Sequence, residues 1–91
     1  MIKKDASFGR NELVDHLEKN NIQTRMLFAG NLIKHPCFDE MRNAGEGYRV
    51  IGELTNTDNV MNDGFWIGVY PGMTQPMLDF MIQKIVEFCQ K

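Results

Sequence analysis

The chain has 91 residues, and its apolar share of 43% and charged share of 24% are those of a globular protein, so we expect one domain over residues 1–91 with one modest core. No apolar run approaches the about 18 residues that a membrane span needs, and a net charge of −2 with scattered lysines and arginines argues against nucleic-acid binding. The N-terminus lacks the apolar segment of a secretory signal, so the expected compartment is the cytoplasm.

A first helix is predicted to begin near Arg10. With Gly9 as the N-cap, the carboxylate of Glu12 is placed to accept the backbone N–H of the cap, and Phe8 is placed to pack on Leu13. One apolar stripe follows at helical spacing, formed by Leu13, Val14 and Leu17. Positions 20–21 are Asn-Asn, and asparagine tolerates the left-handed conformation that ends a helix.

Residues 22–28 are predicted to form a strand, because apolar and polar side chains alternate along them. The alternation places Ile22, Thr24, Met26 and Phe28 on one face and Gln23, Arg25 and Leu27 on the other. Arg25 is therefore expected to point away from the main apolar face, as in a half-covered sheet. Residues 29–31, Ala-Gly-Asn, are predicted to form a turn.

Weaker signals occupy the middle of the chain. Pro36 suits the first turn of a helix, so a short helix is predicted at residues 37–43. Residues 48–54 fit either a short strand or an extended loop. Thr57 and Asp58 offer N-cap chemistry for a brief helix after that segment.

Residues 65–70 are predicted to form one short buried strand, because aromatic, β-branched and glycine residues stand there between two turn signals. We expect this strand to lie at the centre of the core. Thr74 then caps a helix that carries the strongest periodic signal of the chain. Its apolar stripe consists of Leu78, Met81, Ile82, Ile85 and Cys89.

Together these elements predict an α+β fold: a two-layer small domain with a short antiparallel or mixed sheet and helices packed on one side. Phe80 and Phe88 widen the apolar surface of the last helix beyond one stripe, and Leu27 adds an apolar side chain on the Arg25 face. Apolar surface of this kind is expected to remain exposed on a single copy. Self-association as a homodimer is therefore predicted.

Residue chemistry alone indicates no catalytic constellation. His16 has no partner in the sequence and is interpreted as a solvated histidine, whereas His35 lies in a polar loop where a ligand has room. Cys37 and Cys89 stand outside any metal-binding spacing, and no lysine lies in the apolar setting that Schiff-base chemistry uses. No metal site and no cofactor are therefore expected in this chain.

Two blocks of the sequence closely resemble one enzyme family. The first block is Ile-Gln-Thr-Arg at 22–25, Leu-Phe-Ala-Gly-Asn-Leu at 27–32 and Pro36; the second is Leu-Thr-Asn-Thr-Asp at 54–58, Met-Asn-Asp at 61–63 and Phe-Trp-Ile-Gly-Val-Tyr-Pro-Gly at 65–72. They resemble the carboxy-terminal part of the lipopolysaccharide-biosynthesis 3-dehydrases that act on CDP-4-keto-6-deoxyglucose, within the DegT/DnrJ/EryC1 sugar aminotransferase group. The resemblance covers residues 1–88.

The resemblance implies the small C-terminal domain of a fold-type I, vitamin-B6-dependent protein of O-antigen deoxysugar biosynthesis. In full-length members this domain packs against a large cofactor domain, which is absent from this chain. The pyridoxal or pyridoxamine phosphate site and the iron–sulfur cysteines of those members lie upstream of the matched portion. The chain is accordingly expected not to be an enzyme by itself, and its expected partner is the missing large domain or a second copy.

By the same resemblance, the loop after residue 25 approaches the sugar-nucleotide site. The residues implied to bind that substrate are Arg25, Phe28, Asn31, Lys34 and His35. Arg25 suits a phosphate or carboxylate, with a surface salt bridge as its alternative role, and Asn31 suits a sugar hydroxyl. His35 stands in place of an expected glutamine, and Cys37 in place of an aromatic residue. The alternative function is a free-standing interaction or nucleotide-sugar-binding module.

Overall fold

The computed structural model describes residues 1–90, and helix α1 (Arg10–Lys19) begins where its cap residues predict. The Glu12 carboxylate accepts the backbone N–H of Gly9 at 3.3 Å. At the other end, Asn21 is left-handed (φ 62°), and the N–H groups of Ile22 and Asn21 donate to the carbonyls of Leu17 (2.9 Å) and Glu18 (3.0 Å). These two bonds form a Schellman motif, so both ends of α1 are specified by local sequence.

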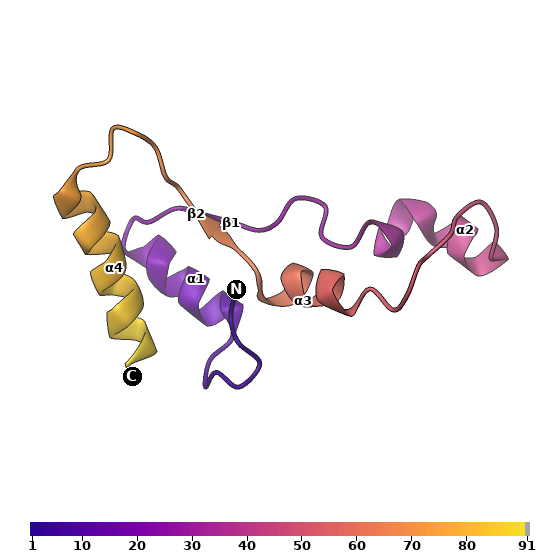
Figure 1. The fold of residues 1–91 in the computed structure, drawn as a ribbon, viewed down its shortest axis with the longest axis horizontal. Coiled ribbons are helices and arrows are strands. Elements are labelled where there is room, and N and C mark those ends of the chain that lie inside the picture. Colours follow the sequence, from indigo (N-terminus) through magenta and orange to yellow (C-terminus); the bar gives the residue numbers. More distant parts are fainter. Residues whose placement is uncertain (91) are drawn as a thin grey trace.

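Helix α4 (Gln75–Cys89) also begins as predicted, because the Thr74 hydroxyl accepts the N–H of Met77 at 3.4 Å. It lies side by side with α1 (Figure 1). The predicted apolar stripe is only partly correct, since Met81 is buried and Ile85 packs on the core while Ile82 and Cys89 are exposed. The face toward α1 includes Phe88 instead, whose ring meets the Phe8 ring edge-on at 5.0 Å.

The core lies between these two helices and not at the predicted central strand. Its buried members are Leu13, Leu17, Ile22 and Met81. Of residues 65–70, only β2 (Trp66–Ile67) is a strand, and Trp66, Val69 and Tyr70 are exposed. Phe65 and Ile67 pack against this core from its edge, but apolar composition alone does not bury the whole segment, and β2 pairs with one strand only.

The predicted strand at residues 22–28 is likewise shorter, since β1 comprises Thr24–Arg25. It pairs antiparallel with β2, with Thr24 opposite Ile67 and Arg25 opposite Trp66. The sheet is thus limited to two residues per strand, and it meets the helices through the core, on which Ile67 of β2 packs. The α+β class and the antiparallel sense of the sheet are confirmed.

Residues 26–64 leave this helical unit and return to it as one projection, which we call the arm (Figure 1). Its elements in chain order are η1 (Leu32–Lys34), η2 (Pro36–Phe38), α2 (Asp39–Ala44) and α3 (Thr55–Asp63). The short helix predicted after Pro36 is confirmed in outline, and residues 48–54 form the extended loop rather than the strand. Helix α3 begins before Thr57 and Asp58, so neither caps it.

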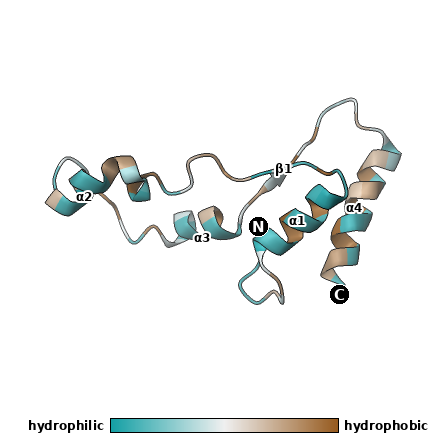
Figure 2. Ribbon diagram, turned by 180° about the vertical axis from the view of Figure 1, so that it is seen from behind, coloured by the Kyte–Doolittle hydropathy of each residue, from teal (hydrophilic) through white to brown (hydrophobic). Residues whose placement is uncertain are grey.

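The arm makes the molecule elongated. The radius of gyration is 17.2 Å, whereas a compact chain of this length has about 12 Å. The accessible surface is 7080 Å², against about 5,400 Å² for a compact monomer of this mass. Figure 2 shows apolar stretches on α1 and α4 and also along the arm. Over residues 1–90, none of the helices has the length and apolar character to span a membrane.

Candidate functional site

The loop implied to bind substrate is folded back beneath α3 by a tight turn. Ala29 and Gly30 are both left-handed, with φ of 69° and 57°. A Cβ at Gly30 would lie 2.7 Å from Cγ of Met61, so glycine lets the loop approach α3 closely. The turn delivers Asn31 to the inner side of the arm, where its side chain is only 2% exposed.

Asn31 and Lys34 converge on one carboxylate, that of Asp58 on α3. The Asn31 side-chain amide and the Lys34 ammonium each donate to Oδ1 of Asp58 at 2.8 Å. These bonds favour the ionised carboxylate, and the Lys34 bond followed by the Asn31 bond lowers the Asp58 pKa below its ordinary value of 3.8. The sequence placed Asp58 at a helix cap, but it is the centre that ties the loop to α3.

The Asp58 contacts predict that acid loosens the arm. Because the folded-state pKa lies below 3.8, the stabilisation is complete above that value and is lost as the pH falls through the lower folded-state pKa. We expect the Asn31 side-chain amide resonances in NMR spectra to shift with a midpoint below pH 3.8. The Asp58→Asn variant should lack this transition, and a midpoint above 3.8 in the parent chain would contradict the bond network.

His35 is held by its own loop. Its Nε2 forms a hydrogen bond with the Ala29 carbonyl, and the Arg42 guanidinium donates to the carbonyls of Ile33 and His35, the latter at 3.0 Å. Arg42 also pairs with Asp39. The imidazole and the loop backbone are thus fixed from both sides, which gives the loop a defined shape.

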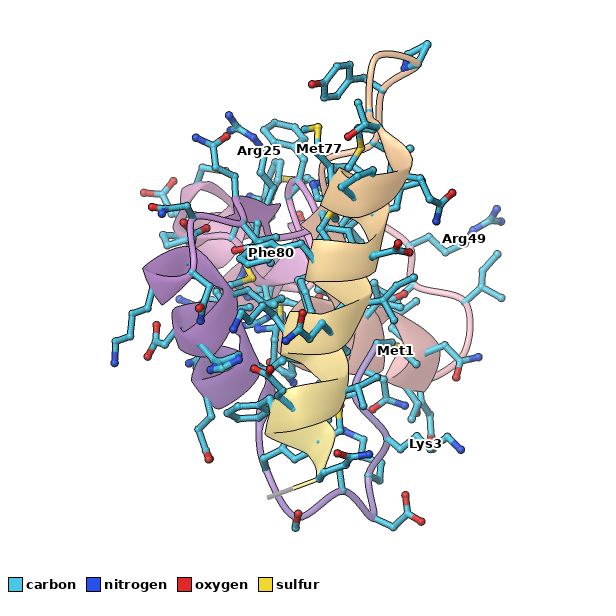
Figure 3. The ribbon with its side chains drawn as sticks, turned by 90° about the vertical axis from the view of Figure 1, so that its left-hand side faces the viewer. Met1, Lys3, Arg25, Arg49, Met77 and Phe80 are labelled. Atoms are coloured by element: carbon cyan, nitrogen blue, oxygen red, sulfur yellow. The ribbon has the colours of Figure 1, made fainter. Side chains whose placement is uncertain are left out.

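Arg25 and Phe28 are not brought to the Asp58 cluster. Both are exposed, Phe28 to 89%, and within residues 1–90 the Arg25 side chain has neither a hydrogen bond nor an ion pair. The structure therefore gives no support to the salt bridge considered for Arg25. Figure 3, which looks along the long axis, shows Arg25 and Arg49 projecting from opposite sides of the molecule.

An open hollow of about 450 Å³ lies beside Asn31 on the arm. It is lined by Gly30, Asn31, Leu32, Ile33, Arg49, Val50, Ile51, Leu54 and Thr57. Arg49 was not predicted, because a lone arginine in a weakly patterned segment carries no spacing signal. The hollow joins apolar walls to one cation at its edge, which suits binding of an anion-bearing ligand but offers no acid–base pair.

Metal-binding clusters and His16 concern the remaining described part of the chain. No group of three or more His, Cys, Asp or Glu gathers there in a way that would hold a metal ion. His16, interpreted from the sequence as solvated, instead lies between the helices, with Nε2 3.0 Å from the Lys84 carbonyl and its ring 5.1 Å from that of Phe88. Its role is to join α1 to α4.

Comparison with known proteins adds a family. A model of the DegT/DnrJ/EryC1/StrS aminotransferase family matches residues 1–86. The chain is 49% identical over 87 residues to the lipopolysaccharide biosynthesis protein RfbH of Salmonella typhimurium, covering 96% of this chain and 19% of that protein. It is 47% identical over 90 residues to the dTDP-4-dehydro-2,6-dideoxy-D-glucose 3-dehydratase of Saccharopolyspora spinosa, covering 99% and 18%. The chain thus spans less than a fifth of the length of these relatives.

Proposed function

Because this chain belongs to the DegT/DnrJ/EryC1/StrS aminotransferase family, we propose that it is the small C-terminal domain of a nucleotide-sugar 3-dehydratase-like or aminotransferase-like protein of lipopolysaccharide deoxysugar biosynthesis. The observation that carries the proposal is near-half identity along almost the whole chain to two proteins, one of them named as a sugar 3-dehydratase and the other as a lipopolysaccharide biosynthesis protein. In this proposal a larger cofactor domain completes the enzyme.

The proposed role of the chain is to supply one edge of the sugar-nucleotide site. The loop of Asn31 and His35 is held in shape by Asp58 and Arg42, and the hollow beside it is lined in part by Arg49, whose side chain forms no hydrogen bond or ion pair within residues 1–90. A guanidinium binds phosphate oxygens in bidentate fashion, so Arg49 suits the diphosphate of a nucleotide sugar. Arg25 and Phe28 are exposed and lie outside the Asp58 cluster, and in this proposal they contact substrate only if the larger domain brings it to them.

The chain is proposed not to hold the vitamin B6 cofactor or an iron–sulfur cluster itself; both belong to the larger domain. Schiff-base formation uses an unpaired amine in an apolar setting. Lys34 pairs with Asp58 at 2.8 Å, and Lys84 pairs with Glu87 at 3.2 Å beneath the Phe80 ring. Cys37 and Cys89 are separate, exposed thiols.

A chimera tests the proposed function. We expect the Saccharopolyspora 3-dehydratase, with its 90 matched residues replaced by this chain, to retain dehydratase activity within about tenfold, because the two sequences are 47% identical there. The free chain should show none. A chimera that folds but is more than a thousandfold less active would contradict the proposal.

Calorimetric titration of the free chain with CDP and dTDP distinguishes the proposed function from the alternative, a free-standing nucleotide-sugar-binding module. Half a site should bind these nucleotides more weakly than about 10 μM, which corresponds to about 7 kcal/mol. Tighter binding that is lost in an Arg49→Ala variant would favour a free-standing nucleotide-sugar-binding module.

Retention of pyridoxal phosphate after desalting would contradict the absence of a cofactor site.

When the chain is studied without the larger domain, its exposed apolar surface is available to bind a second copy. The accessible surface exceeds that of a compact monomer by about 1,600 Å², and a stable homodimer buries roughly 1,000–2,500 Å² per partner. We therefore expect sedimentation of the free chain to show a dimer that dissociates between micromolar and submicromolar concentration. A monomer throughout that range, with no binding of a hydrophobic dye, would contradict this prediction.

A further inference from the structure

We propose that the arm, residues 26–64, is the surface that packs against the remaining four fifths of a full-length family member, and that the outer face of α4 is not. This inference rests on the proposed function, because it names the part of the chain that meets the larger domain. The sequence pattern favours α4 for that contact, since apolar residues cover a wider part of its circumference than of any other predicted helix. The structure points to the arm for three independent reasons.

The first reason is area. The excess of about 1,600 Å² over a compact monomer arises from the shape of the chain, whose extents are 53 × 31 × 21 Å, and the arm produces the long dimension. An interface between domains of one protein buries about 600–1,500 Å². Covering one side of the arm accounts for an excess of that size, whereas covering α4 leaves the arm unsupported.

The second reason is the backbone. Within the described residues, no N–H or C=O group of residues 46–53 forms a hydrogen bond, although this segment is eight residues long and follows the C-cap of α2. Gly47 and Gly52 are left-handed and break the segment into short extended pieces. These exposed groups bond to water in the free chain, and as groups without a partner inside the chain they are open to hydrogen bonds from another surface, where burial would require such partners. The backbone of α4 is satisfied within the helix.

The third reason is the composition of the two exposed faces. On the arm, Val50 and Ile51 are exposed beside Arg49 in the segment 46–53, with Ile51 at 77%. Phe28 and Leu32 are exposed in the part of the arm that leads away from the helical unit. On α4, Met77, Phe80, Ile82 and Val86 are also exposed, at 41–59%, and Figure 3 shows Met77 and Phe80 along the N-terminal half of that helix.

Polar pairs border the α4 residues. Gln75 donates to Asp79 and Gln83 donates to Glu87, each at 2.8 Å. At 3.6 residues per turn, the row of these pairs separates Met77 and Phe80 from Ile82 and Val86, so the exposed apolar side chains of α4 form two small groups, and small exposed apolar groups are normal on protein surfaces. The occupant we commit to is the larger domain, since the chain spans only 19% and 18% of its relatives and most of their length lies outside it.

Two matched substitutions, each of which introduces a negative charge, test the inference in the chimera described above. Ile51 (77% exposed) and Ile82 (59% exposed) are of the same residue type, one on the arm and one on α4. In the free chain at a concentration that gives monomers, Ile51→Asp and Ile82→Asp should each leave the thermal midpoint unchanged. In the chimera, Ile51→Asp should lower the midpoint by about 5 °C or more, because it buries an unpaired carboxylate, whereas Ile82→Asp should not. The reverse pattern, or no effect from either, would overturn the inference.

Hydrogen exchange supplies a second readout that needs no variant. Amides of residues 46–53 in the free monomer should exchange at nearly the rate of an unstructured peptide, since none is hydrogen-bonded within residues 1–90. In full-length RfbH of Salmonella typhimurium, the aligned segment should be protected by at least about a hundredfold. Equal, rapid exchange in both would overturn the inference.

Failure of the proposed function looks different from failure of the inference. If the chimera is folded but inactive, the proposed function fails, yet the two midpoints and the exchange rates still report whether the arm is covered. If the chimera is active and only Ile82→Asp lowers its midpoint, the function stands and the docking surface is α4. Activity together with loss of stability from Ile51→Asp and protection of the aligned segment supports both.

Discussion

Replacing Leu17 with alanine is expected to lower the free energy of unfolding by about 2–5 kcal/mol, the usual range for a fully buried leucine. Leu17 is 0% exposed and belongs to the buried cluster of Leu13, Ile22 and Met81 between α1 and α4. A 91-residue chain has about 5–14 kcal/mol in total, and this chain has only a small core. The loss is therefore a large fraction of its stability, and urea unfolding followed by circular dichroism measures it.

Ile82→Ala is the matched control on the neighbouring helix. Ile82 is 59% exposed, so removing its side chain leaves no cavity and should change the free energy of unfolding by less than about 0.5 kcal/mol. If the two variants were equally stable, the core would not lie between α1 and α4. If Leu17→Ala removed only part of the cooperative transition, the arm would be a separate folding unit.

The parts of the fold that the sequence predicted are those specified by neighbouring residues. Gly9 with Glu12, and Thr74 with Met77, are cap pairs within one helical turn. Asn21 lies one residue beyond the C-cap of α1, where left-handed geometry is required. Such contacts depend on three to five consecutive residues, so reading them needs no knowledge of the tertiary structure.

The parts that failed depend on what covers each segment. Residues 65–70 have the composition of a buried strand, yet Val69 and Tyr70 are exposed, because composition records a tendency to be buried and not the presence of a partner. The same limit explains α4, where α1 selects Met81 and Ile85 and leaves Ile82 outside. Under the inference above, part of the missing cover belongs to the larger domain.

The candidate site also has one part that the sequence predicts and one part that depends on the tertiary structure. The family resemblance predicts the loop, and the structure gives Asn31, Lys34 and His35 defined hydrogen bonds in it. Two further members, Asp58 and Arg49, come from segments 14 or more residues away, and only the return of the arm brings them there. No local pattern predicts a long-range pair of that kind, although the strong preference of buried amides for hydrogen-bond partners indicates that Asn31 needs one.

Replacing Asn31 with aspartate is expected to open the base of the arm. The substitution keeps the size of the side chain but puts a second carboxylate 2.8 Å from Asp58 in a place where the parent side chain is 2% exposed. Two negative charges at so short a distance repel each other, and burial of the new carboxylate further lowers the stability of the folded arm. We expect exchange of the protected α3 amides, such as that of Asp58, to rise on the order of a hundredfold at pH 7, while amides of α1 keep their rates.

The pH dependence of Asn31→Asp separates repulsion from simple loss of a bond. In the variant, repulsion and burial raise the pKa of the new carboxyl group above its unfolded value, so the destabilisation is full at neutral pH and shrinks as the pH falls toward about 4. The parent chain has the opposite trend, because protonating Asp58 removes its bonds to Asn31 and Lys34. Asn31→Ala, which loses the bond without adding charge, should open the arm less and show neither trend above pH 4. If all three chains exchanged alike, the Asn31–Asp58 bond would not hold the arm, and Asn31 would be free to bind substrate as the family resemblance implies.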